Sequence, residues 1–301
     1  NCAYELLMEL QQKYGRDIPV TVLIGSIRDK KRLDEVFETY HPTVVFHAAA
    51  HKHVPLMEVS PAEAVKNNVL GTKNLLVSAS EHDVERFVQL STDKAVNPTS
   101  VMGCTKRICE MLIQTFAGNT DMKCVAVRFG NVLGSHGSVI PLFEAQIKKG
   151  GPVTLTDPNI ERYFMTIPEA AQLVLQAGAL AESGSIYVLD MGEPVKIMDL
   201  AKQLIRFYGY EPGVNMEIKV VGLRPGEKLY EELMMDEEQD KMRRTVHNKI
   251  FVAPPRNIDL GEFYQQLQEL AVAAEHNDDS VVEQLAQMVP TLSLIHISEP
   301  T

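Results

Sequence analysis

Short apolar runs alternate with amphipathic segments along the first half of the chain. Four of these runs show no alternation between polar and apolar positions, which predicts buried strands. They cover residues 20–24, 44–48, 87–90 and 125–129. Apolar side chains at helical spacing predict intervening helices at residues 31–40, 62–80 and 101–116. Helices between non-alternating strands indicate a parallel sheet covered on both faces. Right-handed crossovers would make this α/β fold a doubly wound, Rossmann-like sheet.

The second half of the chain is less regular. Two glycines and a proline at residues 150–152 interrupt the pattern, and we place a domain boundary there. We expect residues 1–150 to form the Rossmann-like domain and residues 151–290 to form a smaller part that is partly woven back onto the sheet. A further strand is predicted at residues 186–189. Helices are predicted at residues 168–180, 197–208, 260–273 and 280–288.

Both ends of the sequence depart from a complete dinucleotide-binding fold. The chain opens inside a predicted helix, residues 4–14, and it contains no GxGxxG or GxxGxxG motif. Such a fold begins with a strand and a glycine-rich turn, so we expect the sequence to be a fragment that lacks both. Residues 291–301 resemble a translated sequencing adapter. We interpret them as a non-native tail and exclude them from the fold.

The composition narrows the class of protein. The chain has 301 residues, of which 45% are hydrophobic, and its net charge is -11. A nucleic-acid-binding protein needs a basic stripe, and the sequence shows none. No segment approaches the roughly 20 apolar residues of a membrane helix. The 4 cysteines form no CxxC pair and no disulfide framework, so we expect reduced thiols and a cytoplasmic protein.

Polar residues follow the predicted strand that ends at residue 90. Thr92, Asp93 and Lys94 place a hydroxyl, a carboxylate and an ammonium group together. Ligands of a parallel sheet bind at the carboxyl ends of its strands, where such groups can exchange protons with a substrate. Taken alone, the three residues are explained more simply by an Asp that caps the next turn beside a solvated Lys.

Other strand ends carry small or polar residues as well. Small residues at 48–50 would let a ligand approach the backbone, although a tightly packed turn explains them equally well. Met102 and Lys106 share one face of the next helix, where Lys106 alone is more simply a surface charge. Asn131 lies in a flexible turn after another strand. The coincidence of several such strand ends indicates a binding site at this edge.

A metal site is weakly indicated. His47, His51 and His53 are close in sequence, but His47 should lie within a strand and no acidic partner completes a ligand set. We therefore expect no metal.

Several longer sequence segments resemble the extended short-chain dehydrogenase/reductase superfamily and, more narrowly, the CapD-like polysaccharide-biosynthesis dehydratases. They lie at residues 47–58, 67–72, 91–98, 128–135, 162–170 and 223–228. The resemblance extends to about residue 253. Long segments in a fixed order are more specific than a single glycine motif.

The resemblance implies a 4,6-dehydratase that acts on a UDP-N-acetylhexosamine, with UDP-N-acetylglucosamine as the expected sugar nucleotide. The expected cofactor is NAD rather than NADP. It takes a hydride from C4, water is lost across C5 and C6, and the hydride returns to C6. The 4-keto-6-deoxy product would enter surface polysaccharide or glycan biosynthesis. The configuration at C5 stays open.

The resemblance also assigns roles to residues. Thr92 would contact the C4 oxygen, Asp93 would protonate the leaving hydroxyl, and Lys94 would take the C5 proton, its pKa lowered by burial. Met102 stands where the superfamily usually has Tyr, which leaves open the group that handles the C4 hydroxyl proton. The implied cofactor contacts are Ser26, Ile27, Ala48, Ala49, Ala50, Lys52, Asn67 and Lys106. The implied substrate contacts are His53, Asn131, Arg162, Arg224 and Glu227.

Two alternatives remain at this point. A C4 epimerase of the same superfamily would return the hydride to C4, and Met102 argues against it. A non-catalytic nucleotide-binding module could share the fold, and the cluster around Asp93 argues against that. Relatives often carry an amino-terminal membrane anchor, so the full protein could be anchored at the inner face of the plasma membrane. A homo-oligomer is also compatible with the resemblance.

Overall fold

The centre of the molecule is a six-stranded sheet. The computed structural model describes residues 2–135 and 137–294. The strands follow the order β1 (Val44–His47), β2 (Arg86–Leu90), β3 (Lys123–Arg128), β8 (Ile186–Leu189), β12 (Ile250–Val252) and β11 (Arg243–Arg244). The first four are parallel, and the last two add antiparallel pairing at one edge. The predicted α/β class with a parallel, Rossmann-like sheet is confirmed.

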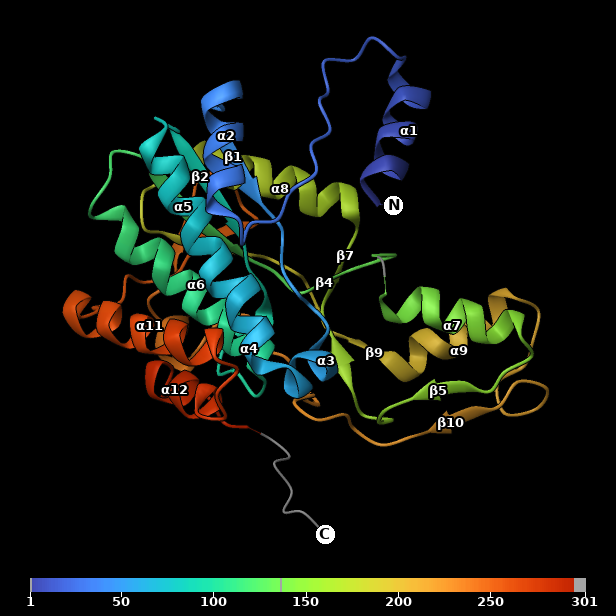
Figure 1. The fold of residues 1–301 in the computed structure, drawn as a ribbon. Coiled ribbons are helices and arrows are strands. Elements are labelled where there is room, and N and C mark those ends of the chain that lie inside the picture. Colours follow the sequence, from blue (N-terminus) through green and yellow to red (C-terminus); the bar gives the residue numbers. More distant parts are fainter. Residues whose placement is uncertain (1, 136, 295–301) are drawn as a thin grey trace.

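Helices cover both faces of the sheet (Figure 1). One face carries α2 (Lys30–Tyr40), α5 (Gly71–Glu81) and α6 (Val101–Ala117), and the other carries α8 (Ile167–Leu180). Asp29 caps α2 and Ser100 caps α6 with side-chain oxygens that accept backbone N–H groups. The chain begins with α1 (Cys2–Tyr14), which stands away from α2 and α5 in Figure 1.

The helix predicted at residues 62–80 is a continuous helical stretch with three geometries. It consists of α4 (Pro61–Ala64), a π-helical segment (Val65–Leu70) and α5. It follows the short helix α3 (Val54–Val59). A π-helical segment inside an α-helix often marks a functional site. Here it carries Asn68, which contacts the loop after β1.

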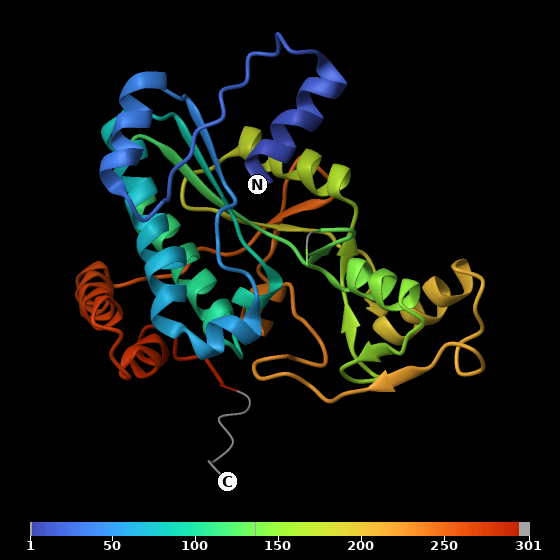
Figure 2. The ribbon, with the colours of Figure 1, turned by 45° about the vertical axis from the view of Figure 1, so that its right-hand side comes forward.

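A smaller part extends from the sheet, on the right of Figure 1, and Figure 2 shows it turned forward. Its core lies between α7 (Val139–Lys148), α9 (Ile197–Phe207), β5 (Val153–Leu155) and β10 (Ile218–Val220). Two short pairs, β4 (Asn131–Val132) with β7 (Phe164–Met165) and β6 (Glu161–Arg162) with β9 (Val195–Lys196), join it to the sheet. The chain then returns through α10 (Asp236–Gln239).

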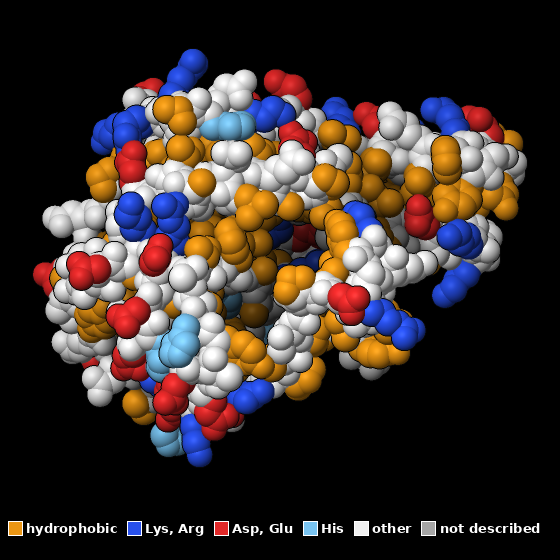
Figure 3. All heavy atoms as spheres, turned by 90° about the horizontal axis from the view of Figure 1, so that it is seen from above, with side chains coloured by type: hydrophobic (Ala, Val, Ile, Leu, Met, Phe, Trp, Pro, Cys, Tyr) orange, Lys and Arg blue, Asp and Glu red, His pale blue; other side chains and the backbone are white. Residues whose placement is uncertain are grey.

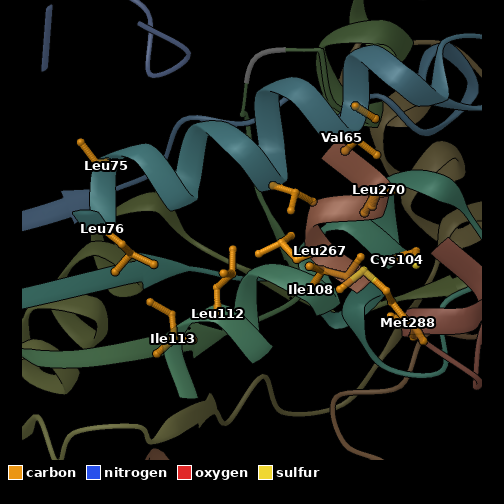
Figure 4. Close-up of a cluster of buried hydrophobic side chains, with 14 of the residues drawn as sticks. Val65, Leu75, Leu76, Cys104, Ile108, Leu112, Ile113, Leu267, Leu270 and Met288 are labelled. Atoms are coloured by element: carbon orange, nitrogen blue, oxygen red, sulfur yellow. The ribbon is translucent and has the colours of Figure 1, made fainter. Parts of the chain in front are cut away.

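The main hydrophobic core lies between the sheet and its helices. In Figure 4, Leu76, Leu112 and Ile113 pack beside one another, and Leu267 and Leu270 reach the same cluster from a later helix. That helix is α11 (Leu260–Glu275), which packs against the π-helical segment, α4 and α12 (Val281–Met288), and α12 packs against α6. The core fixes the beginning of α6, which carries Met102 and Lys106.

The strand predicted at residues 20–24 is absent from the structure, so that prediction was wrong. This segment is an exposed connection to α2, and Ile24 is 78% exposed. An apolar, β-branched run favours extended backbone, but a strand also needs a neighbour for its hydrogen bonds. Among the described strands, none lies beside this segment, and β1 pairs with β2 alone.

Candidate active site

The carboxyl ends of three parallel strands meet at one edge of the sheet. The loop after β1 holds Ala48 to His53, the turn after β2 holds Thr92 to Lys94, and the turn after β3 leads to Asn131. Seen from above in Figure 3, the molecule has a central hollow with apolar side chains at its rim and charged side chains inside. The edge therefore has the location that ligands occupy in parallel sheets.

Thr92, Asp93 and Lys94 form a hydrogen-bonded cluster. Asp93 is fully buried, and its Oδ1 accepts hydrogen bonds from Thr92 Oγ1 at 2.8 Å and from Lys94 Nζ at 3.0 Å. The 3-10 turn Asp93–Ala95 bends the chain so that these neighbouring side chains meet. Lys94 Nζ also lies 3.4 Å from Asn131 Oδ1, which brings a residue from the next strand end into the cluster.

The second oxygen of the Asp93 carboxylate, Oδ2, has no hydrogen-bond partner among the described residues. It faces Gly130, where an added Cβ would lie 3.2 Å from Oδ2 and 2.9 Å from Tyr163 Cβ. A buried carboxylate oxygen normally has a donor, so this oxygen is available to a water molecule or to a ligand hydroxyl. Glycine at 130 leaves room beside it.

Lys94 carries a proton more firmly than the sequence suggests. Burial lowers the pKa of Lys94, but the carboxylates of Asp93 and Glu231 outweigh both burial and the guanidinium of Arg162. The pKa of Lys94 is therefore raised above its ordinary value, and the prediction that it is lowered was wrong. The prediction considered burial without the second carboxylate, which lies far away in sequence.

Glu231 is a residue of this site that sequence reasoning missed. Its Oε1 lies 3.5 Å from Lys94 Nζ and 3.9 Å from Arg162 Nε, and its side chain is only 4% exposed. It belongs to the segment between β10 and α10, which runs back from the smaller part (Figure 2). The segment packs against the turn after β2, where Lys228 Nζ donates to Val96 O and Thr99 Oγ1 donates to Gly226 O.

A cavity of about 180 Å³ opens beside Lys94 and collects most of the predicted substrate contacts. Arg162 is buried and donates to the backbone carbonyls of Lys228 and Leu229, while Arg224 is exposed at the rim. The cavity is lined by His53, Lys94, Arg162, Arg224, Glu227 and Glu231, together with the predicted cofactor contact Lys52 and seven other residues. The lysine and arginine side chains that line this cavity suit an anionic group such as a diphosphate.

Met102 and Lys106 are both buried on α6, one helical turn apart. Lys106 Nζ donates to Leu90 O, the last carbonyl of β2, at 2.6 Å. Burial lowers the pKa of Lys106. A surface position for Lys106, the simpler interpretation of the sequence, is excluded because its exposed fraction is 6%. The ammonium group instead lies against the strand end that leads into Thr92.

Asn68, the neighbour of the predicted cofactor contact Asn67, holds the loop after β1. Its Oδ1 accepts from His51 N at 2.7 Å, and its Nδ2 donates to His51 O and to Thr105 Oγ1. The Asn67 side chain donates to Asn68 Oδ1. The two adjacent amides could not be told apart from sequence, because the π-helical segment decides which one faces inwards.

A second cavity, of about 390 Å³, has almost entirely apolar walls. Phe46, Ala48, Leu90 and Phe129 line it from the ends of β1, β2 and β3, and α8 closes the opposite side. Ala48 and Ala49 are exposed, so the backbone there is open to a ligand. Ser26 and Ile27 lie further along, where Ile27 packs against Gly71 at the beginning of α5. The arrangement fits an elongated, partly aromatic cofactor.

The histidines near β1 do not converge on a metal. His47 Nε2 shares a hydrogen bond with Thr72 Oγ1, and burial lowers the pKa of His47 to about 3, so the ring is neutral. Within residues 2–135 and 137–294, no three His, Cys, Asp or Glu side chains are placed to hold a metal ion. In the same described part of the chain, no helix is both long and apolar enough to cross a membrane.

Comparison with known proteins places this geometry in a family. The family model described as "Polysaccharide biosynthesis protein" matches residues 1–255. The capsular polysaccharide biosynthesis protein CapD of Staphylococcus aureus is 56% identical over 252 residues, which are 83% of this chain and 42% of that protein. The UDP-glucose 4-epimerase of Rickettsia canadensis is 39% identical over 246 residues, covering 80% of this chain and 65% of that protein.

Two solved structures share the fold. Pen from Bacillus thuringiensis is 36% identical with a TM-score of 0.77, and the match covers 84% of this chain and 78% of that one. A double mutant of DesIV, the dTDP-glucose 4,6-dehydratase from Streptomyces venezuelae, was solved with NAD and DAU bound. It is 18% identical with a TM-score of 0.69, over 92% of this chain and 86% of that one. The likeness to DesIV shows the fold alone.

Proposed function

The chain belongs to the polysaccharide biosynthesis protein family, and from this premise we propose that it is an NAD-dependent nucleotide-sugar 4,6-dehydratase. Its substrate is a UDP-N-acetylhexosamine, with UDP-N-acetylglucosamine as the first choice. The chain spans 42% of the length of CapD, so the proposal concerns the part that carries the sheet and its edge.

The observation that carries the proposal is the cluster of Thr92, Asp93 and Lys94. A dehydration needs a group that gives a proton to the leaving hydroxyl and a group that takes the C5 proton. The buried Asp93 carboxylate and the adjacent Lys94 amine supply this pair, with Oδ2 of Asp93 left without a partner on the side of Gly130. A module that only binds nucleotides has no need of such a pair.

Each residue has one task in the reaction. Bound NAD would supply a hydride acceptor for C4 and a hydride donor for C6, while the C4 hydroxyl proton is released to solvent. Lys94 takes the C5 proton, Asp93 gives a proton to the C6 hydroxyl, and the C6–O bond breaks as a C5=C6 bond forms. Once C6 is reduced, Lys94 returns a proton to C5 and Asp93 regains one from solvent, which balances the proton released from the C4 hydroxyl. Thr92 hydrogen-bonds the C4 oxygen.

The residues present fit the cofactor. The apolar cavity beside Ala48 and Leu90 suits a nicotinamide ring, and the buried Lys106 suits the hydroxyls of its ribose. NAD is bound in the solved DesIV structure, which shares the sheet. Ala49, Ala50, Lys52 and Asn67 remain proposed contacts along the loop after β1, as Ser26 and Ile27 do for adenine. Positioning by these residues matters more than a protein nucleophile.

Epimerisation at C4 is the second candidate, since a relative that is 39% identical is a UDP-glucose 4-epimerase. An epimerase needs a group that shuttles the C4 hydroxyl proton. Met102 stands where the superfamily usually has a Tyr for this purpose, and its thioether cannot carry a proton. We therefore rank dehydration first.

One experiment separates the candidates. The purified full-length protein is incubated with NAD and UDP-N-acetylglucosamine, and the nucleotide sugars are analysed by mass spectrometry and NMR. A product lighter by one water, with a methyl group at C6 and a ketone at C4, supports the dehydratase. A product of unchanged mass with inverted C4 supports the epimerase, and unchanged substrate contradicts both.

A further inference from the structure

Lys94 Nζ lies between two carboxylates and one guanidinium. Asp93 Oδ1 is 3.0 Å away and Glu231 Oε1 is 3.5 Å away. Arg162 opposes them as a second cation, with its Nε 3.9 Å from the same oxygen of Glu231. Glu231 Oε2 is buried and has no hydrogen-bond partner within the described residues. The protein therefore satisfies this buried carboxylate mainly through the cations at its other oxygen, Lys94 and Arg162.

We propose that Glu231 is a positioning residue that keeps the shared proton on the Lys94–Asp93 pair and aligns Lys94 with Arg162. Glu231 acts through Lys94 and takes no part in bond breaking. The inference rests on the proposed function and deepens it, because it names Glu231 as the residue that controls the protonation of the Lys94–Asp93 pair.

The reaction requires one proton on the Lys94–Asp93 pair. Before water is lost, Asp93 must hold a proton to give and Lys94 must be neutral to receive one. An ammonium–carboxylate pair and an amine–carboxylic acid pair contain the same number of protons, and one transfer across the 3.0 Å hydrogen bond interconverts them. A pair that loses this proton to solvent can still accept at C5, but it has nothing to deliver to the C6 hydroxyl.

Glu231 prevents that loss. A negative charge near an amine favours its charged form, and together with Asp93 it raises the pKa of Lys94 despite burial and Arg162. The other charged residues that line the cavity beside Lys94 are Lys52, Arg224, Glu227 and Lys228, with His53 as a titratable neighbour. Because the cations outnumber the anions there, Lys94 would lose its proton more readily without Glu231.

The first test measures the proton on Lys94 without any turnover. Protein is labelled with limiting acetic anhydride across a pH series, and the reactivity of Lys94 is read by mass spectrometry against the exposed Lys219. We expect the half-titration of Lys94 to move to lower pH in Glu231→Gln and to stay near wild type in Glu231→Asp. Glu232→Gln is the matched control, since Glu232 pairs with Lys228 and not with Lys94.

The second test measures the pH profile of kcat/KM with the sugar nucleotide. We expect the alkaline limb to move to lower pH in Glu231→Gln, with partial recovery in Glu231→Asp and no movement in Glu232→Gln. A lower plateau with an unmoved limb, or an unmoved Lys94 titration, would overturn the role of Glu231. The labelling result does not depend on turnover, so a wild-type protein inactive on every sugar nucleotide would count against the proposed function instead.

Discussion

Arg128, at the end of β3, forms a two-pronged ion pair with Glu110 of α6. Arg128 Nε donates to Glu110 Oε1 at 3.0 Å, and Arg128 Nη2 donates to Oε2 at 2.9 Å. Ser91 Oγ, which directly precedes Thr92, also donates to Glu110 Oε1, at 2.7 Å. The pair therefore connects the ends of β2 and β3 beneath the candidate active site.

Replacing Glu110 with Gln should destabilise the protein strongly. The side chains of Glu110 and Arg128 are fully buried, and removal of one partner of such a pair costs about 3–5 kcal/mol. Urea denaturation followed by circular dichroism measures the loss. The exposed Glu269→Gln is the control, with little expected change. A denaturation midpoint equal to that of wild type would contradict the structural role.

The same carboxylate predicts a pH dependence of stability. Burial raises the pKa of Glu110, but Arg128 and Arg107 overcome it and lower the pKa from 4.5 to about 2. A depressed folded-state pKa contributes stability above the unfolded value, and this contribution is lost as pH falls from 4.5 towards 2. The free energy of unfolding of Glu110→Gln should therefore vary less with pH over this window than that of wild type.

Asp93→Asn should retain cofactor binding and stop water loss. The amide keeps the size of the carboxylate and can still accept from Thr92, but it cannot deliver a proton to the C6 hydroxyl. We expect NAD affinity within about twofold of wild type by calorimetry, and a fall in kcat of about 10²–10⁴-fold, the usual contribution of a general acid. Turnover near wild type would remove Asp93 from this role.

The sequence predicted the elements that local patterns determine. The strands and helices of the parallel sheet lie close to their expected positions, because non-alternating runs and helical spacing report burial directly. Residues 20–24 show the limit of this reasoning: strand formation depends on a neighbour, which a local pattern does not contain.

The site residues that directly follow strands could be predicted from the sequence. Residues that reach the site from a segment far away in sequence could not. Asp93, Lys94 and Asn131 meet because parallel strands end at one edge. Glu231 reaches Lys94 across more than a hundred residues of sequence, by way of the smaller part. The negative charge of Glu231 helps to raise the pKa of Lys94, which the sequence had led us to expect to be lowered. The wrong prediction for this pKa therefore came from not knowing that Glu231 lies beside Lys94.

Gly130→Ala should reduce turnover more than it reduces stability. Its Cβ would lie 2.9 Å from Tyr163 Cβ and 3.2 Å from Asp93 Oδ2, the oxygen proposed to meet the substrate. Shifting that oxygen by a few tenths of an ångström should disturb proton delivery. The control is Gly118→Ala, since a Cβ there meets nothing within 4 Å. Kinetics and thermal melts of both variants decide the matter, and equal kcat in the two would contradict the assignment.

Lys106→Ala should mainly weaken cofactor binding. The ammonium is buried at the end of β2, where its Nζ donates to Leu90 O, and Leu90 lines the adjacent apolar cavity that is proposed to hold the nicotinamide. Loss of one charged hydrogen bond costs roughly 1.5–3 kcal/mol, so NAD affinity should fall about 10- to 150-fold by calorimetry. Because Lys106 also anchors a strand end, Lys106→Met serves as a size-matched control for packing. The Lys106→Met variant should restore stability without restoring NAD affinity.

Recovery of NAD affinity in Lys106→Met, or unchanged NAD affinity in Lys106→Ala, would show that Lys106 contributes packing rather than a contact with the cofactor.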